Sequence, residues 1–397
     1  MRKRSVRDAN VTDKRVLVRV DFNLPFIPNT TVISDDVRIH AVLPTLKYLR
    51  NQGAKIILCS HLGRPGGTIA EDMRLGPVAR RLEGIVGQDI VYVDDCIGSV
   101  VGQAAKELGP GQIMLLENLR FYPEEETNDE KFAQELASVA DIYVNDAFGA
   151  SHRAHASIVA VTNHLPPYVG LQMERELSML SAALNQPERP LAAIMGGAKI
   201  GDKIDVLHSL VQKVDKLFIG GGMASTFFKA QGFEVGDSLV EDNRIPVAKD
   251  ILRIAESNGV EVFLPKDLVV TQEFLATAPF EIVGVEQIPA TGFVMDVGPM
   301  TIKSFKEAMQ DCRTLLWNGP MGVFEYKPFA VGTTAIAEIL ADLNGAITIV
   351  GGGSTAEAVD GLGLSVAMNH VSMGGGASLE FLEGRLLPGI EVLPDKV

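Results

Sequence analysis

Residues 171–186 read LQMERELSMLSAALNQ, and this stretch separates two halves of the chain that differ in chemistry. Its apolar residues recur every three or four positions, the spacing of one helix face: Met173, Leu177, Leu180 and Leu184. Prolines stand before it and directly after it, at Pro167 and Pro187, and bound the predicted helix. Glu174, Arg175 and Glu176 are expected to lie largely off the apolar face.

This segment has two interpretations, an ordinary surface helix or a hinge. Strand-like segments before it run into Arg, His, Asp and Asn, whereas those after it run into glycine clusters. The change of chemistry favours a hinge helix between two domains.

The length and composition set the broad class. A chain of 397 residues exceeds one ordinary core, so two domains are expected. The formal net charge of −14 argues against a general nucleic-acid binder and makes any local cluster of basic side chains informative. Three widely spaced cysteines suggest neither a zinc site nor a disulfide framework. With no apolar leader and no transmembrane-length run, a cytoplasmic protein is expected.

Strand and helix patterns alternate in the first half. Strands are predicted at 15–20, 55–59, 90–93, 113–116 and 142–144, with helices at 39–50, before 86, and at 103–108 and 132–140. Such alternation predicts a parallel sheet wound with helices, whose ligands bind beyond the carboxyl ends of the strands.

Polar and basic residues follow these strands. The set comprises Asp21, Asn23, His61, Arg64, Arg120 and Arg153, with Arg38 at the start of a predicted helix. A single loop arginine is usually a solvated surface charge, but several cations at successive strand ends of an acidic protein indicate a pocket. Because arginine donates in pairs to phosphate and carboxylate, the expected ligand is small and strongly anionic. Asp21 and Asn23 would hold its hydroxyl.

The second half also alternates, but its strands run into glycine. Strands at 191–195, 216–219, 314–317, 346–350 and 371–373 are followed by Gly196-Gly197, Gly220–Gly222, Gly319, Gly351–Gly353 and Gly374–Gly376. Glycine lets the backbone approach a ligand, and a helix N-terminus offers unpaired N–H groups. With Lys199 and Lys203, these turns predict phosphate recognition.

Two standard nucleotide motifs fail on inspection. Gly351, Gly353 and Ala356 match the spacing of a dinucleotide fingerprint, but no acidic residue ends the next strand to hold a ribose. Residues 196–203 (GGAKIGDK) lack the Gly-Lys-Ser/Thr core of a Walker A loop. Neither standard motif is therefore present, but the glycine turns and helix N-termini that both motifs use to bind phosphate are.

The chain closely resembles phosphoglycerate kinases over essentially its whole length. The motifs that carry the resemblance are RVDFNLP at 19–25, SHLGRP at 60–65, ENLRF at 117–121, NDAF at 145–148, GGAK at 196–199, WNGPMGVFE at 317–325 and GGGAS at 374–378. The resemblance implies two doubly wound, Rossmann-like parallel-sheet α/β domains joined by the hinge helix. It divides the chain into residues 1–170, 171–186 and 187–378, and a segment 379–397 that returns to the first domain.

The implied reaction is reversible transfer of the acyl phosphate of 1,3-bisphosphoglycerate to ADP, giving 3-phosphoglycerate and ATP, with Mg²⁺. The resemblance assigns phosphoglycerate to Asp21, Asn23, Arg38, His61, Arg64, Arg120 and Arg153. It assigns the nucleotide to Lys199, Gly220, Gly221, Gly292, Asn318, Glu325, Gly352, Gly353, Ser354 and Thr355. Arg38, Lys199, Lys203, Gly374 and Gly375 are the expected catalytic groups. A monomer without nucleic-acid or membrane partners is expected.

One position departs from the family pattern. Ser354 stands where the family usually has an Asp that contacts the metal–nucleotide, and a hydroxyl is the weaker Mg²⁺ ligand. We therefore expect retained activity with altered metal affinity.

Two other functions compete with this interpretation. A non-catalytic phosphometabolite-binding protein would share the basic pocket but would not need a second, nucleotide-type site. A nicotinamide dehydrogenase is suggested only by the Gly351 match.

Overall fold

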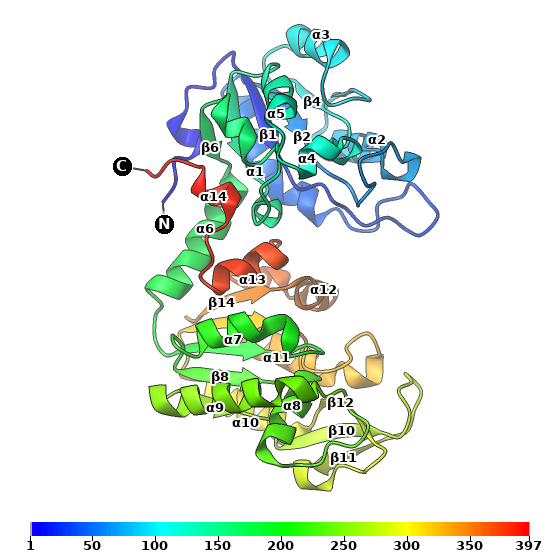
Figure 1. The fold of residues 1–397 in the computed structure, drawn as a ribbon, viewed down its shortest axis with the longest axis vertical. Helices are drawn as coiled ribbons and strands as arrows, with labels where there is room; N and C mark the ends of the chain where they lie inside the picture. Colours follow the sequence, from blue (N-terminus) through cyan, green and yellow to red (C-terminus); the bar gives the residue numbers. More distant parts are fainter. Residues whose placement is uncertain (1, 397) are drawn as a thin grey trace. The chain divides into compact units, whose positions relative to one another are not determined.

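The structure is a computed structural model that describes residues 2–396, apart from the side chain of Asp202. These residues form two compact units. The first runs to Ser178 and includes the segment from Leu386 onward, and the second is Met179–Arg385. The predicted α/β class with two parallel-sheet domains is confirmed. Figure 1 shows the helices and strands of both units.

The first unit contains a six-stranded parallel sheet in the order β3-β4-β2-β1-β5-β6. Its strands are β1 (Arg15–Arg19), β2 (Lys55–Cys59), β3 (Ile90–Tyr92), β4 (Ile113–Leu115), β5 (Ile142–Asn145) and β6 (Pro167–Val169). Its helices are α1 (Val37–Asn51), α2 (Gly76–Val86), α3 (Ser99–Glu107), α4 (Pro123–Glu126), α5 (Glu130–Ala137) and α14 (Pro388–Glu391).

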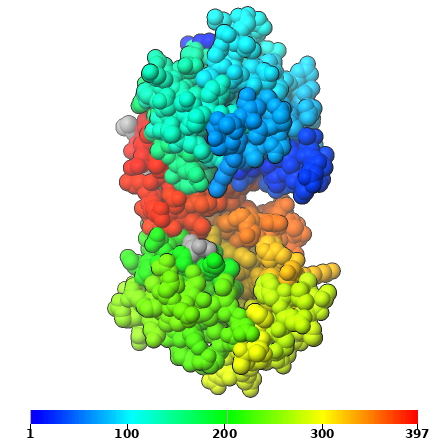
Figure 2. Space-filling view, turned by 45° about the vertical axis from the view of Figure 1, so that its right-hand side comes forward, coloured from blue at the N-terminus to red at the C-terminus, as the bar shows by residue number. Residues whose placement is uncertain are grey.

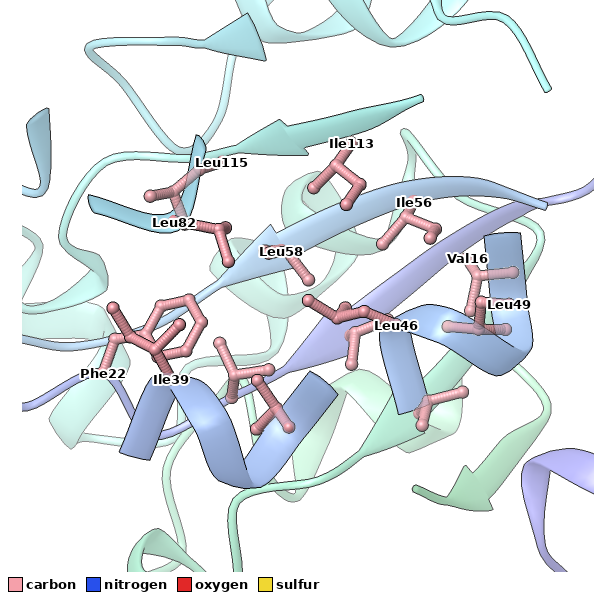
Figure 3. Packing of buried hydrophobic residues seen from close by; sticks show 14 of the residues in the cluster. Val16, Phe22, Ile39, Leu46, Leu49, Ile56, Leu58, Leu82, Ile113 and Leu115 are labelled. Atoms are coloured by element: carbon pink, nitrogen blue, oxygen red, sulfur yellow. The ribbon is translucent and has the colours of Figure 1, made fainter. Parts of the chain in front are cut away.

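Both faces of this sheet are buried, as the β-branched strands predict. Alternate residues of β1 and β2 belong to two separate apolar cores: Val16, Val18, Ile56 and Leu58 to one, and Leu17 and Ile57 to the other. Figure 3 shows the first core, where Leu46 and Leu49 of α1 pack near Val16 of the sheet. The carboxyl ends of β1, β2, β4 and β5 therefore meet at one edge of a rigid sheet.

The second unit repeats this plan with strands in the order β15-β14-β13-β7-β8-β9. The strands are β7 (Leu191–Met195), β8 (Lys216–Ile219), β9 (Glu261–Phe263), β13 (Thr314–Asn318), β14 (Ile347–Gly351) and β15 (His370–Val371). The helices are α7 (Ile204–Leu210), α8 (Met223–Gln231), α9 (Ile245–Asn258), α10 (Pro299–Met309), α11 (Val331–Asp342), α12 (Gly353–Gly361) and α13 (Gly376–Leu382).

A third, antiparallel sheet in this unit was not predicted. It has the order β11-β10-β12, formed by β10 (Asp267–Thr271), β11 (Phe280–Gly284) and β12 (Phe293–Val297). No strand was assigned in this region from the sequence. The edge strand β11 exposes Phe280 and Ile282, whereas the central strand β10 is buried at every position.

Helix α6 (Leu171–Asn185) confirms the predicted helix to within one residue. Met173, Leu177 and Leu180 are buried as expected, but Glu176 is also buried, at 1% exposure, so its expected place off the apolar face is wrong. Glu176 lies three residues after Met173, which puts both on the same helix face. The division between the two units falls inside α6, after Ser178.

Some element ends differ from prediction for local reasons. Helix α5 begins at Glu130, two residues early, because Asp129 Oδ1 accepts hydrogen bonds from the backbone N–H groups of Lys131 and Phe132, both at 2.9 Å. Pro167 opens β6, an edge strand where a missing N–H is tolerated.

The end of the chain packs on the first unit from Leu386 onward, whereas α13 packs on α7 of the second unit. The Gly389 N–H donates to the carbonyl of Ser151 at 2.9 Å. In Figure 2 the C-terminal segment, in red, lies against teal residues of the first unit. The first unit thus includes the chain from Leu386 onward, and position 379 lies within α13.

Candidate active site

Each parallel sheet has one point where the strand order reverses, and ligands of wound α/β sheets bind there. In the first unit the chain builds outward from β1 through β2 and then returns to add β5 on the other side of β1. In the second unit it builds from β7 through β8 and then adds β13 on the other side of β7. The candidate residues lie at these two points.

In the first unit, three loops are tied together by polar side chains. Arg38, in the first turn of α1, forms an ion pair with Asp21, which follows β1. Asn23 Oδ1 accepts a hydrogen bond from the Gly63 N–H at 2.8 Å, and Arg120 Nη1 donates to the Gly63 carbonyl at 2.7 Å. The structure thus brings together predicted residues that follow β1, β2 and β4.

Arg120 is buried, with only 8% of its surface exposed. Burial lowers the pKa of its guanidinium, and the charges of Arg19 and Arg153 lower it further, whereas Glu126 opposes them. Its Nε forms an ion pair with Glu126 Oε1 at 3.1 Å but makes no hydrogen bond with any of residues 2–396. An anionic ligand oxygen would satisfy such a donor.

His61 is also buried, and its ring is held in the neutral form. Burial lowers its pKa well below the ordinary value, and the charges of Arg19, Arg120 and Arg38 act in the same direction. These charges reach the ring because the four side chains gather at one sheet edge. His61 is therefore a neutral hydrogen-bonding group at physiological pH.

Arg153 and Arg64 are the exposed members of the predicted set. Arg153 Nε donates to His152 Nε2 at 3.1 Å, and its charge lowers the pKa of Arg120 and of His155, so it lies close to the cluster. Arg64 follows Gly63 and makes no hydrogen bond or ion pair within the part of the chain that the structure describes. It is the least constrained of the seven predicted residues.

A buried polar layer that was not predicted lies beneath these residues. It comprises Arg19, Glu125, His155 and Ser157, of which Arg19, Glu125 and Ser157 are fully buried. Burial lowers the pKa of His155 to about 3, so this ring is neutral as well. One signal was present in the sequence: Arg19 is a charged residue at the end of a strand that is otherwise buried.

In the second unit, Lys203 joins the two strands at the reversal point. Its ammonium donates to the carbonyl of Gly196, after β7, at 2.7 Å and to the carbonyl of Asn318, at the end of β13, at 2.9 Å. The positive charge therefore sits where the wound sheet is expected to bind its ligand. These contacts give Lys203 a structural task besides the predicted catalytic one.

Asn318 supplies an unpaired donor at the same point. Its side-chain Nδ2 is buried and has no hydrogen-bond partner within residues 2–396. A Cβ added to Gly352, which has φ of +89°, would lie 3.0 Å from this nitrogen. A buried amide donor without an acceptor costs free energy unless a ligand or water pairs with it.

Several of the predicted nucleotide glycines are explained by packing between loops. A Cβ on Gly221 would lie 2.6 Å from the Gly197 nitrogen and 2.8 Å from the Pro320 carbonyl oxygen. A Cβ on Gly220 would overlap Met321, and one on Gly292 would lie 2.6 Å from Val270. These glycines allow backbone to approach backbone or a core side chain, and they do not by themselves indicate a ligand.

Two other glycines face open space. A Cβ on Gly353, the first residue of α12, or on Gly375, just before α13, would meet nothing within 4 Å. Beside Gly353, Ser354 is exposed, whereas Thr355 is buried and its Oγ1 accepts from the Gly319 N–H at 2.7 Å. The Gly374 N–H donates to Ser372 Oγ at 3.2 Å. Gly353 and Ser354 are thus the accessible part of the Gly351–Thr355 turn.

Lys199 and Glu325, the remaining predicted residues, are both exposed. Neither makes a hydrogen bond or ion pair with another residue that the structure describes. Lys199 follows β7 and Glu325 lies in the loop after β13, so both belong to the loops of the reversal point.

Among the described residues, no group of three or more His, Cys, Asp or Glu side chains could hold a metal ion. Ser354 offers a hydroxyl where a carboxylate would bind Mg²⁺ more strongly.

Comparison with known proteins identifies relatives along the whole chain. The sequence model of the family "Phosphoglycerate kinase" matches residues 6–385. A phosphoglycerate kinase of Moorella thermoacetica is 51% identical over 396 residues, which cover 100% of both chains. A relative in Volvox carteri, named as the chloroplastic phosphoglycerate kinase, is 51% identical over 400 residues, covering 99% of this chain and 87% of its own.

A solved structure of a phosphoglycerate kinase has the same fold. The phosphoglycerate kinase of Coxiella burnetii superposes with a TM-score of 0.89 at 37% identity, and the match covers 98% of each chain. In the described part of this chain, none of the helices is both long enough and apolar enough to cross a membrane.

Proposed function

The chain belongs to the phosphoglycerate kinase family, and from this premise we propose that its two sheet edges divide the substrates between them. The chain is a kinase that reversibly transfers the acyl phosphate of 1,3-bisphosphoglycerate to ADP, giving 3-phosphoglycerate and ATP in glycolysis. The first unit binds the phosphoglycerate with charged side chains. The second binds the nucleotide at the reversal point between β7 and β13.

The gathering of basic side chains at one sheet edge carries this proposal. Arg38, Arg120 and Arg153 lie with His61 beyond the carboxyl ends of the strands, in a chain of net charge −14. Guanidinium groups suit the phosphate and carboxylate of phosphoglycerate because they donate in pairs. Two buried donors make no hydrogen bond with a described residue: Arg120 Nε, which is ion-paired with Glu126, and Asn318 Nδ2. They support one anionic or polar ligand in each unit.

The chemistry needs positioning more than proton transfer. In the direction of ATP consumption the acceptor is a carboxylate, which is already ionised at neutral pH, so no general base is required. Arg38 would exchange its partner Asp21 for oxygens of the transferring phosphoryl group, leaving Asp21 and Asn23 to bind the substrate hydroxyl. Lys199 would neutralise nucleotide phosphate charge, and Arg64 would complete the phosphoglycerate site.

On the nucleotide side, the amides of Gly353 and Ser354 at the start of α12 would bind phosphate oxygens. Glu325 would contact the ribose hydroxyls, with Asn318 alongside. Close packing would shape the loops at five of the assigned residues, Gly220, Gly221, Gly292, Gly352 and Thr355. Lys203 would hold β7 and β13 together and add positive charge. Gly374 and Gly375 would border the transferring group. Mg²⁺ would arrive with the nucleotide and reduce the negative charge of its phosphates.

Transfer also requires the two substrates to meet without water. We place the bending for this closure in α6, which keeps its predicted role as a hinge. We further propose a monomer that acts in the cytoplasm on small molecules alone, without nucleic-acid or membrane partners. The net negative charge and three buried, unpaired cysteines are consistent with this setting.

A coupled assay for ATP formation from ADP and 1,3-bisphosphoglycerate tests the proposal. The purified chain should form ATP, and the rate should fall when Arg38 is replaced by alanine while the Kd for ADP changes little. Family membership argues against the two rival functions, a phosphometabolite-binding protein and a nicotinamide dehydrogenase. An inactive chain that binds phosphoglycerate normally would contradict the kinase assignment.

A further inference from the structure

A continuous line of hydrogen bonds runs beneath the phosphoglycerate edge of the first unit. The Ser157 N–H and hydroxyl donate to the two carboxylate oxygens of Glu125 at 2.9 and 2.6 Å. Arg19 Nε donates to Ser157 Oγ at 2.9 Å, and Arg19 Nη2 lies 3.1 Å from His61 Nδ1. The line therefore joins Glu125 in α4 to His61 after β2 through two fully buried side chains.

The chemistry of arginine fixes the direction of every bond in this line. A guanidinium is always charged in proteins and has donors but no acceptor. Because Arg19 must donate, His61 Nδ1 must accept, and the neutral ring must carry its proton on Nε2. His61 Nε2–H makes no hydrogen bond with another residue that the structure describes, so it remains available as a donor.

Glu125 and Ser157 explain how a fully buried arginine keeps one orientation. Arg19 also donates to the carbonyl of Val20, so its donors are fixed on a backbone oxygen, a hydroxyl and a ring nitrogen. Burial raises the pKa of Glu125, and the charge of Arg19 opposes this rise. A buried charge needs such a partner, since an unpaired one is strongly destabilising.

We propose that Glu125 and Ser157 are positioning residues for substrate binding: they hold Arg19 so that Arg19 keeps His61 as a neutral Nε2–H donor to the phosphoglycerate. This inference rests on the proposed function, because it assumes that phosphoglycerate binds at the His61 edge. Neither residue contacts the substrate. Their effect is transmitted through Arg19 to the tautomer of His61.

The test combines a spectroscopic measurement with kinetics on the full chain. Histidine labelled with ¹⁵N reports which ring nitrogen carries the proton, and the His61→Gln variant assigns the His61 signal. The parent should show His61 as the Nε2–H tautomer. The Ser157→Ala variant removes the acceptor of Arg19 Nε, so His61 should become a mixture of tautomers. The KM for 3-phosphoglycerate should rise about tenfold, while the KM for ATP should change less than twofold.

Tyr143→Phe is the matched control. Tyr143 is fully buried and its hydroxyl donates to the Ser157 carbonyl at 2.7 Å, so this variant also removes one buried hydrogen bond from Ser157. It leaves the Arg19 contact untouched. The control should be destabilised comparably yet retain the parental His61 tautomer and KM. If Ser157→Ala does not fold, Glu125→Gln, which keeps the shape of the side chain, replaces it.

Three results would overturn the inference. The first is a parental His61 in the Nδ1–H form. The second is an unchanged His61 tautomer and an unchanged KM in Ser157→Ala or, if that variant does not fold, in Glu125→Gln. The third is a KM change in Tyr143→Phe equal to that in the Ser157 or Glu125 variant. Failure of the proposed function is distinguishable, because the tautomer is read without any substrate. A parent without kinase activity that still shows the Nε2–H form would refute the proposed use of His61 but not its hydrogen bond with Arg19.

Discussion

The two parallel-sheet edges share one architecture but form their candidate sites by different means. In the first unit the site consists of charged side chains that are held by other charged or polar side chains, as with Arg38 on Asp21 and Arg19 on Ser157. In the second unit it consists of glycine loops in close contact, joined by the Lys203 ammonium on two backbone carbonyls. In the proposed assignment, the same strand topology would support recognition by side chains in one unit and by backbone groups in the other.

The two units also stabilise their buried carboxylates by different contacts. Glu125 in the first unit accepts hydrogen bonds from Ser157 and feels the opposite charge of Arg19. Asp296 in the second unit accepts from the backbone N–H groups of Gly332 at 2.8 Å and Val297 at 2.9 Å. Burial raises the pKa of Asp296 to about 7, and no cation contributes to the causes of this shift. The contrast predicts that substitution of Arg38 in the first unit will mainly change kcat, whereas substitutions in the second unit will change stability or nucleotide affinity.

The largest effect is expected from Arg38→Ala. If Arg38 stabilises charge on the transferring group as proposed, removing its guanidinium should lower kcat by at least about 10²-fold, with a smaller change in the KM for nucleotide. Steady-state kinetics in both substrates measure this. Arg81→Ala is the control, since Arg81 is an exposed arginine that pairs with Asp36. Near-parental turnover in Arg38→Ala would remove Arg38 from the catalytic groups.

Gly221→Ala should mainly affect stability. Gly221 has φ of +67° and no room for a Cβ beside Gly197 and Pro320, so alanine should lower the free energy of unfolding by about 2 kcal/mol or more. Denaturant unfolding followed by fluorescence measures the loss. A stability within about 0.5 kcal/mol of the parent would contradict the packing explanation.

Gly353→Ala is the counterpart that separates the two kinds of glycine. Its Cβ would meet nothing within 4 Å, so stability should change by no more than about 0.5 kcal/mol. Nucleotide affinity should nevertheless fall, because the methyl group stands where phosphate is expected to approach the α12 amides. Calorimetric titration with ADP measures the affinity. An unchanged Kd would place the phosphates elsewhere.

Asp296→Asn should change the pH dependence of stability. Because the folded pKa of about 7 exceeds the unfolded value of 3.8, the folded state binds more protons between these limits. The parental chain therefore loses stability as pH rises from about 4 to 7, by up to about 1.4 kcal/mol per pH unit from this group. The variant lacks this titration, so its free energy of unfolding should increase relative to that of the parent as pH rises over this range. A difference independent of pH would show that Asp296 has an ordinary pKa.

Ser354→Asp should have the smallest effect. A carboxylate at this exposed position in the first turn of α12 is a stronger Mg²⁺ ligand than a hydroxyl, so affinity for ADP in the presence of Mg²⁺ should rise by about threefold. The same titration without Mg²⁺ is the control and should show no gain, since the added negative charge opposes phosphate. An equal gain in ADP affinity without Mg²⁺ would show that residue 354 does not act through the metal.

The sequence was sufficient for much of the fold because both sheets are buried on two faces. The strands of RVLVRV and KIILC are continuous apolar runs except for Arg19 and the residues at the strand starts, and they were placed to within one residue. In the third sheet, the edge strand β11 exposes Phe280 and Ile282 and so lacks an apolar burial pattern. The central strand β10 is buried at every position, so exposure does not explain why it was not predicted. The burial of Glu176 was not predicted because glutamate is rarely fully buried, although its spacing from Met173 places it on the apolar face.

The candidate site divides in the same way. Residues that follow strands, such as Asp21 and His61, could be predicted because parallel strands end at one sheet edge. The positioning residues Glu125 and Ser157 could not, since they come from segments far from β1 in the sequence and meet Arg19 only in the folded unit. Nor could the glycines be sorted into packing and open positions without coordinates, because Gly221 and Gly353 look alike in the sequence.

Hydrogen exchange measured with one substrate at a time tests most directly whether the two edges bind different substrates. With 3-phosphoglycerate alone, amide exchange should slow in the loops that follow β1, β2, β4 and β5. With ADP alone, it should slow in the loops that follow β7, β13 and β14, including the start of α12. Protection of the second unit's glycine loops by 3-phosphoglycerate, or of the Arg38 edge by ADP, would contradict the assignment of one substrate to each sheet edge.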